Sequence, residues 1–405
     1  MSFPSAIAPA ITLSDLFPPN TVMAPRTSPA RMRWVNFAPH QLDALTGSPI
    51  TLIGQMPLIC HRGTVTAEIR EFFRMAGIPL DGRYLTYTSL EEAIALAQEC
   101  QRRGQILLYY YPPPDEVTNG DGLIFPPQLY DWLNDKANID RLCPPCHQPP
   151  HRFFQPDDRA ALSGYLPDRA LYLKLCHPGV SGGGADVFYC PDAASRLQAF
   201  DWMAQRPTGW STIRAEEATE VRDSWCLNLF IESGGVRYLG APAQLFSQPG
   251  KQAGSRIDPD NQPSGDTVAL AIEIGHRSRR LGFVGVAGFD IGEDGNGRPF
   301  VFDLNFRFAA CTPQLLMHSA AANRVGGRIS QSLKYQFPGP LSPVLQRLEK
   351  TALEGRFVPL RLYETSGQEG DCSRINGMLI GAAQEEIDEL EMALEGELAG
   401  LATPP

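Results

Sequence analysis

The sequence has no long apolar run, no excess of basic charge and no regular spacing of its cysteines. Without an apolar run of roughly eighteen residues, a membrane-spanning helix is not expected. The net charge of −10 argues against a nucleic-acid-binding surface, which needs clustered lysine and arginine. Nine cysteines, an odd number, fit reduced thiols better than a disulfide framework. Because the first residues also lack the basic and apolar regions of a signal peptide, we expect a cytoplasmic protein.

Several catalytic and cofactor signatures are also missing. No G-x-G-x-x-G follows the first predicted strand, which argues against a Rossmann-type dinucleotide site. No Ser/His or Cys/His arrangement typical of nucleophilic catalysis stands out. The segment Cys143-Pro-Pro-Cys146-His147 matches the C-x-x-C-H pattern of haem attachment and could begin a zinc site, but no second C-x-x-C accompanies it. We interpret this segment as an incidental proline-rich loop.

The length of 405 residues, with 43% hydrophobic and 20% charged residues, indicates a globular protein of two or three domains. Residues 1–47 are rich in proline and are predicted to form an extended arm without a packed element. Residues 48–127 alternate between strand and helix patterns, which favours a small parallel sheet. The predicted elements of that unit are a strand at Leu52–Cys60, a helix at Thr64–Ala76, a strand at Tyr84–Tyr87, a helix at Leu90–Arg103 and a strand at Ile106–Tyr111.

A glycine-rich segment follows a strand predicted at Leu171–Leu175. Its residues lack bulky side chains, so their N–H groups could wrap an anion, although a merely flexible hairpin explains the glycines equally well. Lys174 lies on the preceding strand, and Lys136 lies on a helix predicted at 128–142. Two such lysines can act as point charges for phosphates, whereas each alone is typical of a solvated surface. The loop residues in question are Ser181, Gly182, Gly183 and Gly184.

A hairpin with polar side chains is the most informative pattern. One predicted strand carries Asp290, a glycine-rich acidic turn follows, and the next strand carries Asp303, Asn305 and Arg307 at alternating positions. Alternating residues of a strand point to the same side, so these side chains should converge on one spot. Such a cluster is costly to bury without a partner. Magnesium, which proteins hold through one or two carboxylates together with substrate phosphates, would supply that partner.

The order of these features resembles the ATP-grasp superfamily over about residues 130–330. The features are a lysine on a helix, a lysine on a strand, a glycine-rich loop, an acidic hinge and an acidic pair ending in D-x-N-x-R. The separation of Asp290 and Asp303, 303 − 290 = 13 residues, fits the family's two metal-binding strands. The resemblance implies an α/β and α+β fold: a pre-ATP-grasp Rossmann-like βαβ domain at 48–127, an ATP-grasp domain of two subdomains at 128–335, and a small C-terminal α/β cap at 336–405.

Roles for the ATP-binding residues follow from the resemblance alone. Lys136 and Lys174 would contact the nucleotide, and either Glu216 or Glu217 would face adenine and ribose at the hinge. Asp223 would meet the ribose. The glycine-rich loop would cover the phosphates through Ser181, Gly182, Gly183 and Gly184.

The resemblance also assigns the reacting end of the site. Asp290, Asp303 and Asn305 would hold Mg²⁺, and Arg307 would stabilise the charge that develops during phosphoryl transfer. Asp303 departs from the family, which usually has the longer glutamate at this position. A protein catalyses phosphoryl transfer mainly by positioning the reactants and neutralising charge. The absence of an obvious nucleophilic side chain is therefore expected.

The resemblance implies an ATP- and Mg²⁺-dependent ligase that forms a C–N bond between a small-molecule acid and an amino acid, and releases ADP. Residues 16–26, 60–64 and 302–308 are similar to mycosporine-glycine-forming ligases, which join glycine to 4-deoxygadusol. Another carboxylate–amine or peptide ligase, or a nucleotide-binding protein without turnover, are the alternatives. No nucleic-acid or membrane partner is expected. The amphipathic helix predicted at 385–398 either covers the substrate or forms a homodimer contact, and the sequence leaves both open.

Overall fold

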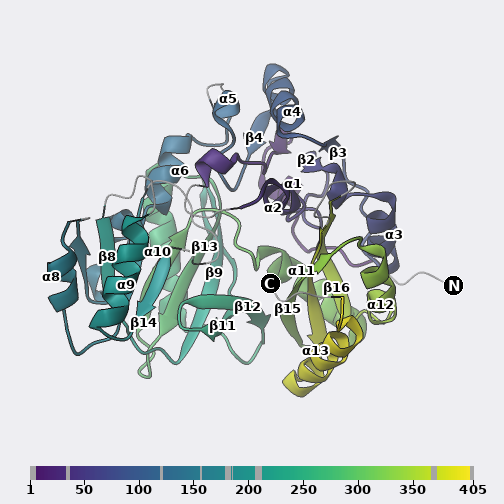
Figure 1. The fold of residues 1–405 in the computed structure, drawn as a ribbon. Helices are drawn as coiled ribbons and strands as arrows, with labels where there is room; N and C mark the ends of the chain where they lie inside the picture. Colours follow the sequence, from purple (N-terminus) through teal and green to yellow (C-terminus); the bar gives the residue numbers. More distant parts are fainter. Residues whose placement is uncertain are drawn as a thin grey trace.

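The computed structural model describes residues 6–32, 37–118, 122–155, 157–177, 184, 186–205, 212–365 and 372–401. Within these ranges the strands form three sheets, which Figure 1 shows as three adjoining parts of the molecule. One sheet is parallel and belongs to the N-terminal part of the chain. In the other two sheets the neighbouring strands are antiparallel. In the described ranges, no helix combines the length and apolar character needed to cross a membrane.

The N-terminal sheet has the strand order β3-β2-β1-β4, and each described pair of neighbours is parallel. Helix α4 begins after Ser89, because the hydroxyl of this N-cap residue accepts a hydrogen bond from the backbone N–H of Glu92. The elements of this part are α1 (Leu13–Leu16), β1 (Thr21–Met23), η1 (Pro29–Arg31), α2 (Pro39–Leu45), β2 (Leu58–His61), η2 (Arg62–Thr64), α3 (Ala67–Met75), β3 (Tyr84–Tyr87), α4 (Leu90–Arg102), β4 (Ile106–Leu108) and α5 (Asp115–Thr118).

The prediction of an arm without packed elements over residues 1–47 is wrong, because β1 lies inside the parallel sheet. Val22 and Met23 are fully buried, and β1 pairs with both β2 and β4. The prolines that suggested an arm stand on either side of this three-residue strand and therefore cost it no ladder hydrogen bond. The predicted strand at Leu52–Cys60 is also shorter than expected, since only its end belongs to β2.

The second sheet, of order β5-β8-β6-β7, is antiparallel and carries helices α8 and α9. Lys174 and the glycine-rich segment belong to this part, because the segment joins β6 to β7 as the sequence predicted. A series of short helical segments links it to the N-terminal sheet. The elements are α6 (Pro127–Asn134), η3 (Lys136–Asn138), α7 (Ile139–Leu142), η4 (Pro145–His147), β5 (His151–Phe154), α8 (Arg159–Gly164), β6 (Leu171–Cys176), β7 (Val187–Cys190), α9 (Ala193–Ala204) and β8 (Thr212–Glu217).

The third sheet is the largest. Among the described residues it has nine strands, in the order β14-β13-β9-β11-β12-β15-β17-β16, with β10 paired to β9. Its central strands β9 and β13 are buried along most of their length, which explains their nearly continuous apolar sequences. The elements are β9 (Asp223–Glu232), β10 (Gly235–Gly240), β11 (Ala243–Gln248), β12 (Lys251–Ile257), α10 (Gly265–Arg280), β13 (Gly285–Glu293), β14 (Pro299–Asn305), α11 (Thr312–Val325), β15 (Ile329–Pro338), α12 (Ser342–Leu353), β16 (Phe357–Glu364), β17 (Cys372–Gly381) and α13 (Gln384–Leu398).

Strand β12 is mostly polar, because half of it faces solvent and its stability comes from pairing with β11 and β15. The domain boundary predicted at 335/336 falls inside β15, which continues the large sheet into its C-terminal strands. One hydrophobic core joins these strands to the N-terminal part, where α3 packs on α12.

Glu293, at the end of β13, is an acidic residue with a structural role. Its Oε1 accepts hydrogen bonds from the backbone N–H of Ser264, at 2.7 Å, and from the hydroxyl of Thr267, at 2.6 Å, so the carboxylate anchors the first turn of α10. We expect Glu293→Ala to lower the free energy of unfolding by about 1–3 kcal/mol, because it leaves buried donors without an acceptor. Urea denaturation measures this loss. An unchanged unfolding midpoint would contradict this role.

Candidate active site

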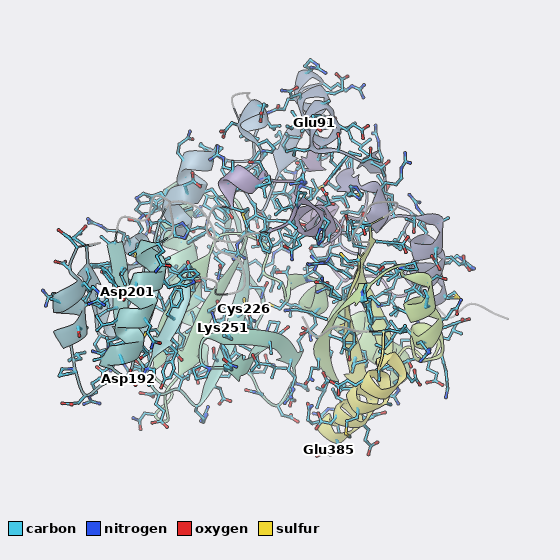
Figure 2. All side chains as sticks on the ribbon, in the orientation of Figure 1. Glu91, Asp192, Asp201, Cys226, Lys251 and Glu385 are labelled. Atoms are coloured by element: carbon cyan, nitrogen blue, oxygen red, sulfur yellow. The ribbon has the colours of Figure 1, made fainter. Side chains whose placement is uncertain are left out.

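A cavity of about 900 Å³ lies where the three sheets meet, and most of the predicted site residues line it. Figure 2 shows Cys226 and Lys251 in the middle of the molecule, close to this region, while Glu91, Asp192 and Glu385 lie at its periphery. The N-terminal part contributes tyrosines and a short loop to the wall. The predicted residues that line the cavity are Lys136, Lys174, Gly184, Asp290, Asp303, Asn305 and Arg307.

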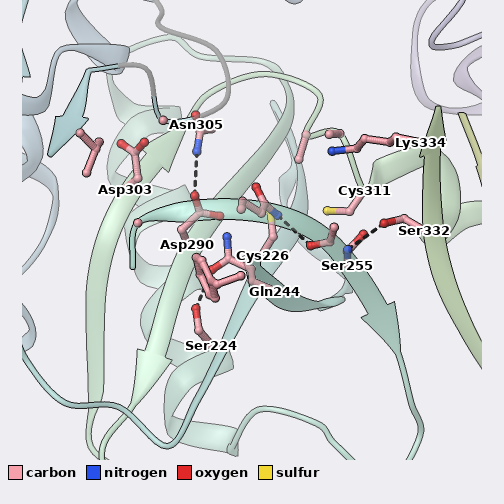
Figure 3. A pocket seen from close by; sticks show the side chains of 18 of the residues that line it. Ser224, Cys226, Gln244, Ser255, Asp290, Asp303, Asn305, Cys311, Ser332 and Lys334 are labelled. Atoms are coloured by element: carbon pink, nitrogen blue, oxygen red, sulfur yellow. Dashed lines mark hydrogen bonds between the residues drawn. The ribbon is translucent and has the colours of Figure 1, made fainter. Parts of the chain in front are cut away.

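The hairpin of β13 and β14 brings its carboxylates together as the sequence predicted. Asp290 and Asp303 are direct cross-strand partners, and a bulge follows between Asp290 and Ile291. Gly297 allows the tight turn, since its φ of +80° is unfavourable for other residues. Asn305 donates from Nδ2 to Oδ2 of Asp290 at 3.4 Å (Figure 3). The two acids and the amide therefore face one point on the cavity wall.

The donor set of this hairpin fits a magnesium ion that is completed by phosphate oxygens. Asp290 and Asp303 supply two carboxylates, and in the described part of the chain no group of three or more His, Cys, Asp and Glu side chains could hold a metal alone. The Oδ1 of Asn305 accepts a hydrogen bond from Arg307 at 2.7 Å. Asn305 would therefore have to release Arg307 before this oxygen could become a ligand.

Burial and the nearby charge of Asp303 raise the pKa of Asp290 to about 7. In an unfolded chain an aspartate ionises near a pH of about 4, so the folded, metal-free protein holds an extra proton between these two values. We therefore expect the stability of the metal-free protein to fall as the pH rises from about 4 to 7. Because Mg²⁺ needs the ionised carboxylate, its stabilising effect should grow over the same range.

Thermal midpoints measured across this pH range, with chelator or with Mg²⁺, test the expectation. Asp290→Asn keeps nearly the same side-chain shape but cannot ionise, so it should remove the part of the pH dependence that Asp290 causes. An identical pH profile in Asp290→Asn and wild type would contradict the assignment.

Lys136 is buried in an ion pair that the sequence did not reveal. Its Nζ donates to Oδ2 of Asp186 at 2.8 Å and lies 3.7 Å from Oδ2 of Asp303. Burial alone would lower the pKa of Lys136, but the two carboxylates outweigh it and raise the pKa. Lys136 also stands outside a regular helix, because α6 ends before Asp135 and Lys136 begins the turn η3. The one available signal for Asp186 was its place at the end of the glycine-rich segment.

The two hinge glutamates face different surroundings. Oε2 of Glu216 lies 2.5 Å from Nζ of Lys174, and its Oε1 accepts from Arg214 at 2.6 Å. Burial would raise the pKa of Glu216, but Lys174 and Arg214 hold it below the usual value. Oε1 of Glu217 lies 3.4 Å from a guanidinium nitrogen of Arg169 on the outer side of the sheet. Of the two, Glu216 is the one coupled to the cavity, through Lys174.

Lys174 is held from both sides, since its Nζ also donates to the carbonyl oxygen of Phe302 on β14 at 2.7 Å. This bond ties the second sheet to the hairpin. Neither Glu216 nor Asp223 lines the cavity, and the carboxylate of Asp223 lies 2.6 Å from Nε of its neighbour Arg222. Along the hinge, Thr219 and Val221 line the cavity instead, and no sequence pattern singled them out.

The predicted loop residues Ser181, Gly182 and Gly183 lie outside the described residues. Gly184 is described and has a φ of +70°, and a Cβ there would come within 3.0 Å of the carbonyl oxygen of Gly250. Lys251 donates from Nζ to the carbonyl oxygens of Gly184 and Val187, at 3.0 and 3.3 Å. Lys251 on β12 therefore holds Gly184 and the start of β7 against the hairpin of β11 and β12.

The Cys143–His147 segment packs against the hairpin as a loop. The buried Cys143 thiol contacts the carbonyl oxygens of Pro144 and His147, and Cys146 is exposed. Nδ1 of His147 lies 3.2 Å from the carbonyl oxygen of Pro299. These side chains support the base of β14 and do not converge on a common point.

Two family models match the chain. Residues 12–131 match the model described as the N-terminal domain of L-aspartate–L-methionine ligase, and residues 166–305 match the model described as the ATP-grasp domain of the same ligase. The first match covers the parallel sheet, and the second begins just after α8, runs to the end of β14 and so includes the hairpin carboxylates.

Solved structures share the arrangement of the whole chain at low sequence identity. N5-carboxyaminoimidazole synthetase from Staphylococcus aureus, complexed with ADP, is 8% identical, with a TM-score of 0.55 and coverage of 98% of this chain and 99% of that chain. Carboxyaminoimidazole ribonucleotide synthase from Aspergillus clavatus, complexed with ATP, is 11% identical, with a TM-score of 0.56 and coverage of 94% and 98%. An L-amino acid ligase from Bacillus licheniformis is 13% identical, with a TM-score of 0.51 and coverage of 93% and 96%. At these identities the likeness shows the fold.

Proposed function

Because the chain belongs to the ATP-grasp superfamily and has the predicted fold, we propose that it is an ADP-forming ligase that uses ATP and Mg²⁺ to join an acid to the amine of an amino acid. An oxygen of the acid attacks the γ-phosphorus of ATP, and ADP leaves. The amine then adds to the activated carbon, loses a proton and displaces phosphate. The net reaction forms one C–N bond for each ATP converted to ADP and phosphate.

The observation that carries this proposal is the convergence of Asp290, Asp303 and Arg307 with two buried lysines on one cavity wall. The carboxylates would hold Mg²⁺, which neutralises charge on the phosphates. Lys136 and Lys174 would position the phosphates as fixed charges, because their carboxylate partners already orient both ammonium groups. Arg307 would stabilise the oxyanion formed when the amine adds.

Two substrate pairs follow from different observations. The matched family models favour an acid and an amine that are both amino acids, with L-aspartate and L-methionine as the first pair to test. Residues 16–26, 60–64 and 302–308 favour 4-deoxygadusol and glycine, whose product would be mycosporine-glycine. In 4-deoxygadusol the enolised diketone is a vinylogous acid, so the same two steps apply.

The test is to incubate the protein with ATP, Mg²⁺ and each pair, to measure ADP, and to identify the product by mass spectrometry. We expect ADP release only when an acid and an amine are both present, with a product mass equal to their sum less one water. ATP binding without ADP release across a broad panel of acids and amines would overturn the ligase proposal in favour of a nucleotide-binding protein without turnover.

A further inference from the structure

A row of polar side chains crosses the C-terminal strands on the side that faces the cavity. Lys334 on β15 is the direct partner of Asn376 on β17, and Asn376 is the direct partner of Arg361 on β16. All three residues line the same cavity as Asp290, Asp303 and Arg307. Figure 3 shows Lys334 extending into this region from the β15 side, across from the labelled hairpin carboxylates.

The charges of this row lack acidic partners among the described residues. The guanidinium of Arg361 donates to Oδ1 of Asn376, at 2.6 and 3.2 Å, and to the hydroxyl of Ser48, at 2.7 Å, and all of these acceptors are neutral. No described carboxylate lies within ion-pair distance of Arg361 or Lys334. Lys136 and Lys174, by contrast, are each paired with a buried acid.

The electrostatics of the row agree with this geometry. Burial, together with the neighbouring charge of Arg374, lowers the pKa of Arg361 to about 10. Packing around the Lys334 side chain and the charge of Arg361 lower the pKa of Lys334, although this residue is exposed to solvent at the cavity wall. Two cations that destabilise each other at the wall of a cavity are stabilised by an anion that enters it. Because Oδ1 of Asn376 is engaged by Arg361, the amide nitrogen of Asn376 is available as a third donor.

We propose that Lys334, Asn376 and Arg361 bind the substrate carboxylate that is not phosphorylated. This carboxylate is either that of the amino acid nucleophile or a second carboxylate on the activated acid. The inference rests on the proposed function, because both candidate amines are amino acids. It places the acid to be phosphorylated beside Asp290 and Asp303, and the unreacting carboxylate across the cavity on β15, β16 and β17. The row thereby selects substrates by the presence of this carboxylate.

Lys334→Gln is the sharpest variant, since the side chain of Lys334 makes no hydrogen bond to any described residue and the substitution keeps the backbone pairing of β15 with β17. We expect the KM of the substrate whose carboxylate the row binds to rise by about 10- to 100-fold, as for loss of a charged hydrogen bond. The KM for ATP should stay within about threefold on the same scale. Lys350→Gln, on the exposed surface of α12, is the matched control and should change neither constant. Arg361→Gln should repeat the effect, and an unchanged KM for both substrates in Lys334→Gln would overturn the inference.

A binding experiment separates this inference from the ligase proposal and needs no turnover. Calorimetric titrations of the full chain with Mg²⁺ and ADP present would compare glycine with glycinamide, and succinate with its monoamide. Tighter binding of glycine supports the carboxylate of the nucleophile, and tighter binding of succinate supports a second carboxylate on the acid, provided that Lys334→Gln abolishes the difference. If carboxylate and amide bind equally in both pairs, the row is not a carboxylate site. Carboxylate binding without ADP release from any substrate pair would support the carboxylate site and contradict the proposed ligase activity.

Discussion

Asp303→Asn is expected to lower the kcat of ADP formation by about 10²- to 10³-fold, the range seen when one electrostatic contact to a transition state is lost. Asp303 faces Asp290 across the hairpin, and its side chain is 27% exposed. Asparagine keeps the acceptor that Leu304 N–H uses at 3.0 Å, so the hairpin should remain folded. The substitution removes one negative charge from the place where the account puts Mg²⁺.

The control for Asp303→Asn is Asp294→Asn, the same chemical change in the turn of the same hairpin. Asp294 accepts hydrogen bonds from the backbone N–H groups of Asn296 and Arg298 and does not line the cavity. We expect Asp294→Asn to keep wild-type turnover. Steady-state ADP release and a thermal melt on both variants make the comparison. If the Asp303→Asn protein is folded and its turnover is undiminished, the catalytic role of the hairpin is contradicted.

Lys136→Met should cost about 3–5 kcal/mol of folding stability, the usual effect of removing one partner of a buried ion pair. Lys136 is 7% exposed and Asp186 is 1% exposed, so the substitution removes the nearest cation from a buried carboxylate, whose other ion-pair partner, Nε2 of His177, lies 3.7 Å away. The same change should weaken ADP binding, because the account uses this ammonium group to position phosphates. Urea denaturation measures the first effect and calorimetric titration with Mg²⁺ and ADP measures the second.

The double variant Lys136→Met/Asp186→Asn distinguishes the two roles of Lys136. Removing both charges should recover much of the lost stability, since the double variant no longer buries a carboxylate at position 186. Nucleotide affinity should stay low, because no cation has been restored. Recovery of nucleotide affinity together with stability would show that Lys136 acts only through the fold.

The hairpin could be predicted from the sequence because its information is local. The alternation of Asp303, Asn305 and Arg307, and the acidic glycine turn before them, lie within one stretch of chain. A strand of period two places such residues on one side whatever surrounds it. The position of Lys174 before the glycine-rich segment was predictable for the same reason. The fold class was implied by the resemblance that the order of these local patterns bears to the ATP-grasp superfamily.

The other parts of the candidate site depend on pairings between distant parts of the chain. Asp186 meets Lys136, which precedes it by fifty residues, and Arg361 meets Ser48 from the opposite end of the chain. The register that aligns Lys334 with Arg361 through Asn376 exists only once three strands have paired. β1 escaped prediction because three buried residues between prolines carry too little pattern to distinguish a strand from a loop.

In the proposed reaction the acid is activated by phosphorylation inside this cavity before the amine attacks. A substrate acid labelled with ¹⁸O in the oxygens that can accept phosphate tests this order of steps when the inorganic phosphate is followed by ³¹P NMR. We expect one labelled oxygen in phosphate for each C–N bond formed, with ADP as the other product. Unlabelled phosphate, or the formation of AMP and pyrophosphate, would contradict it.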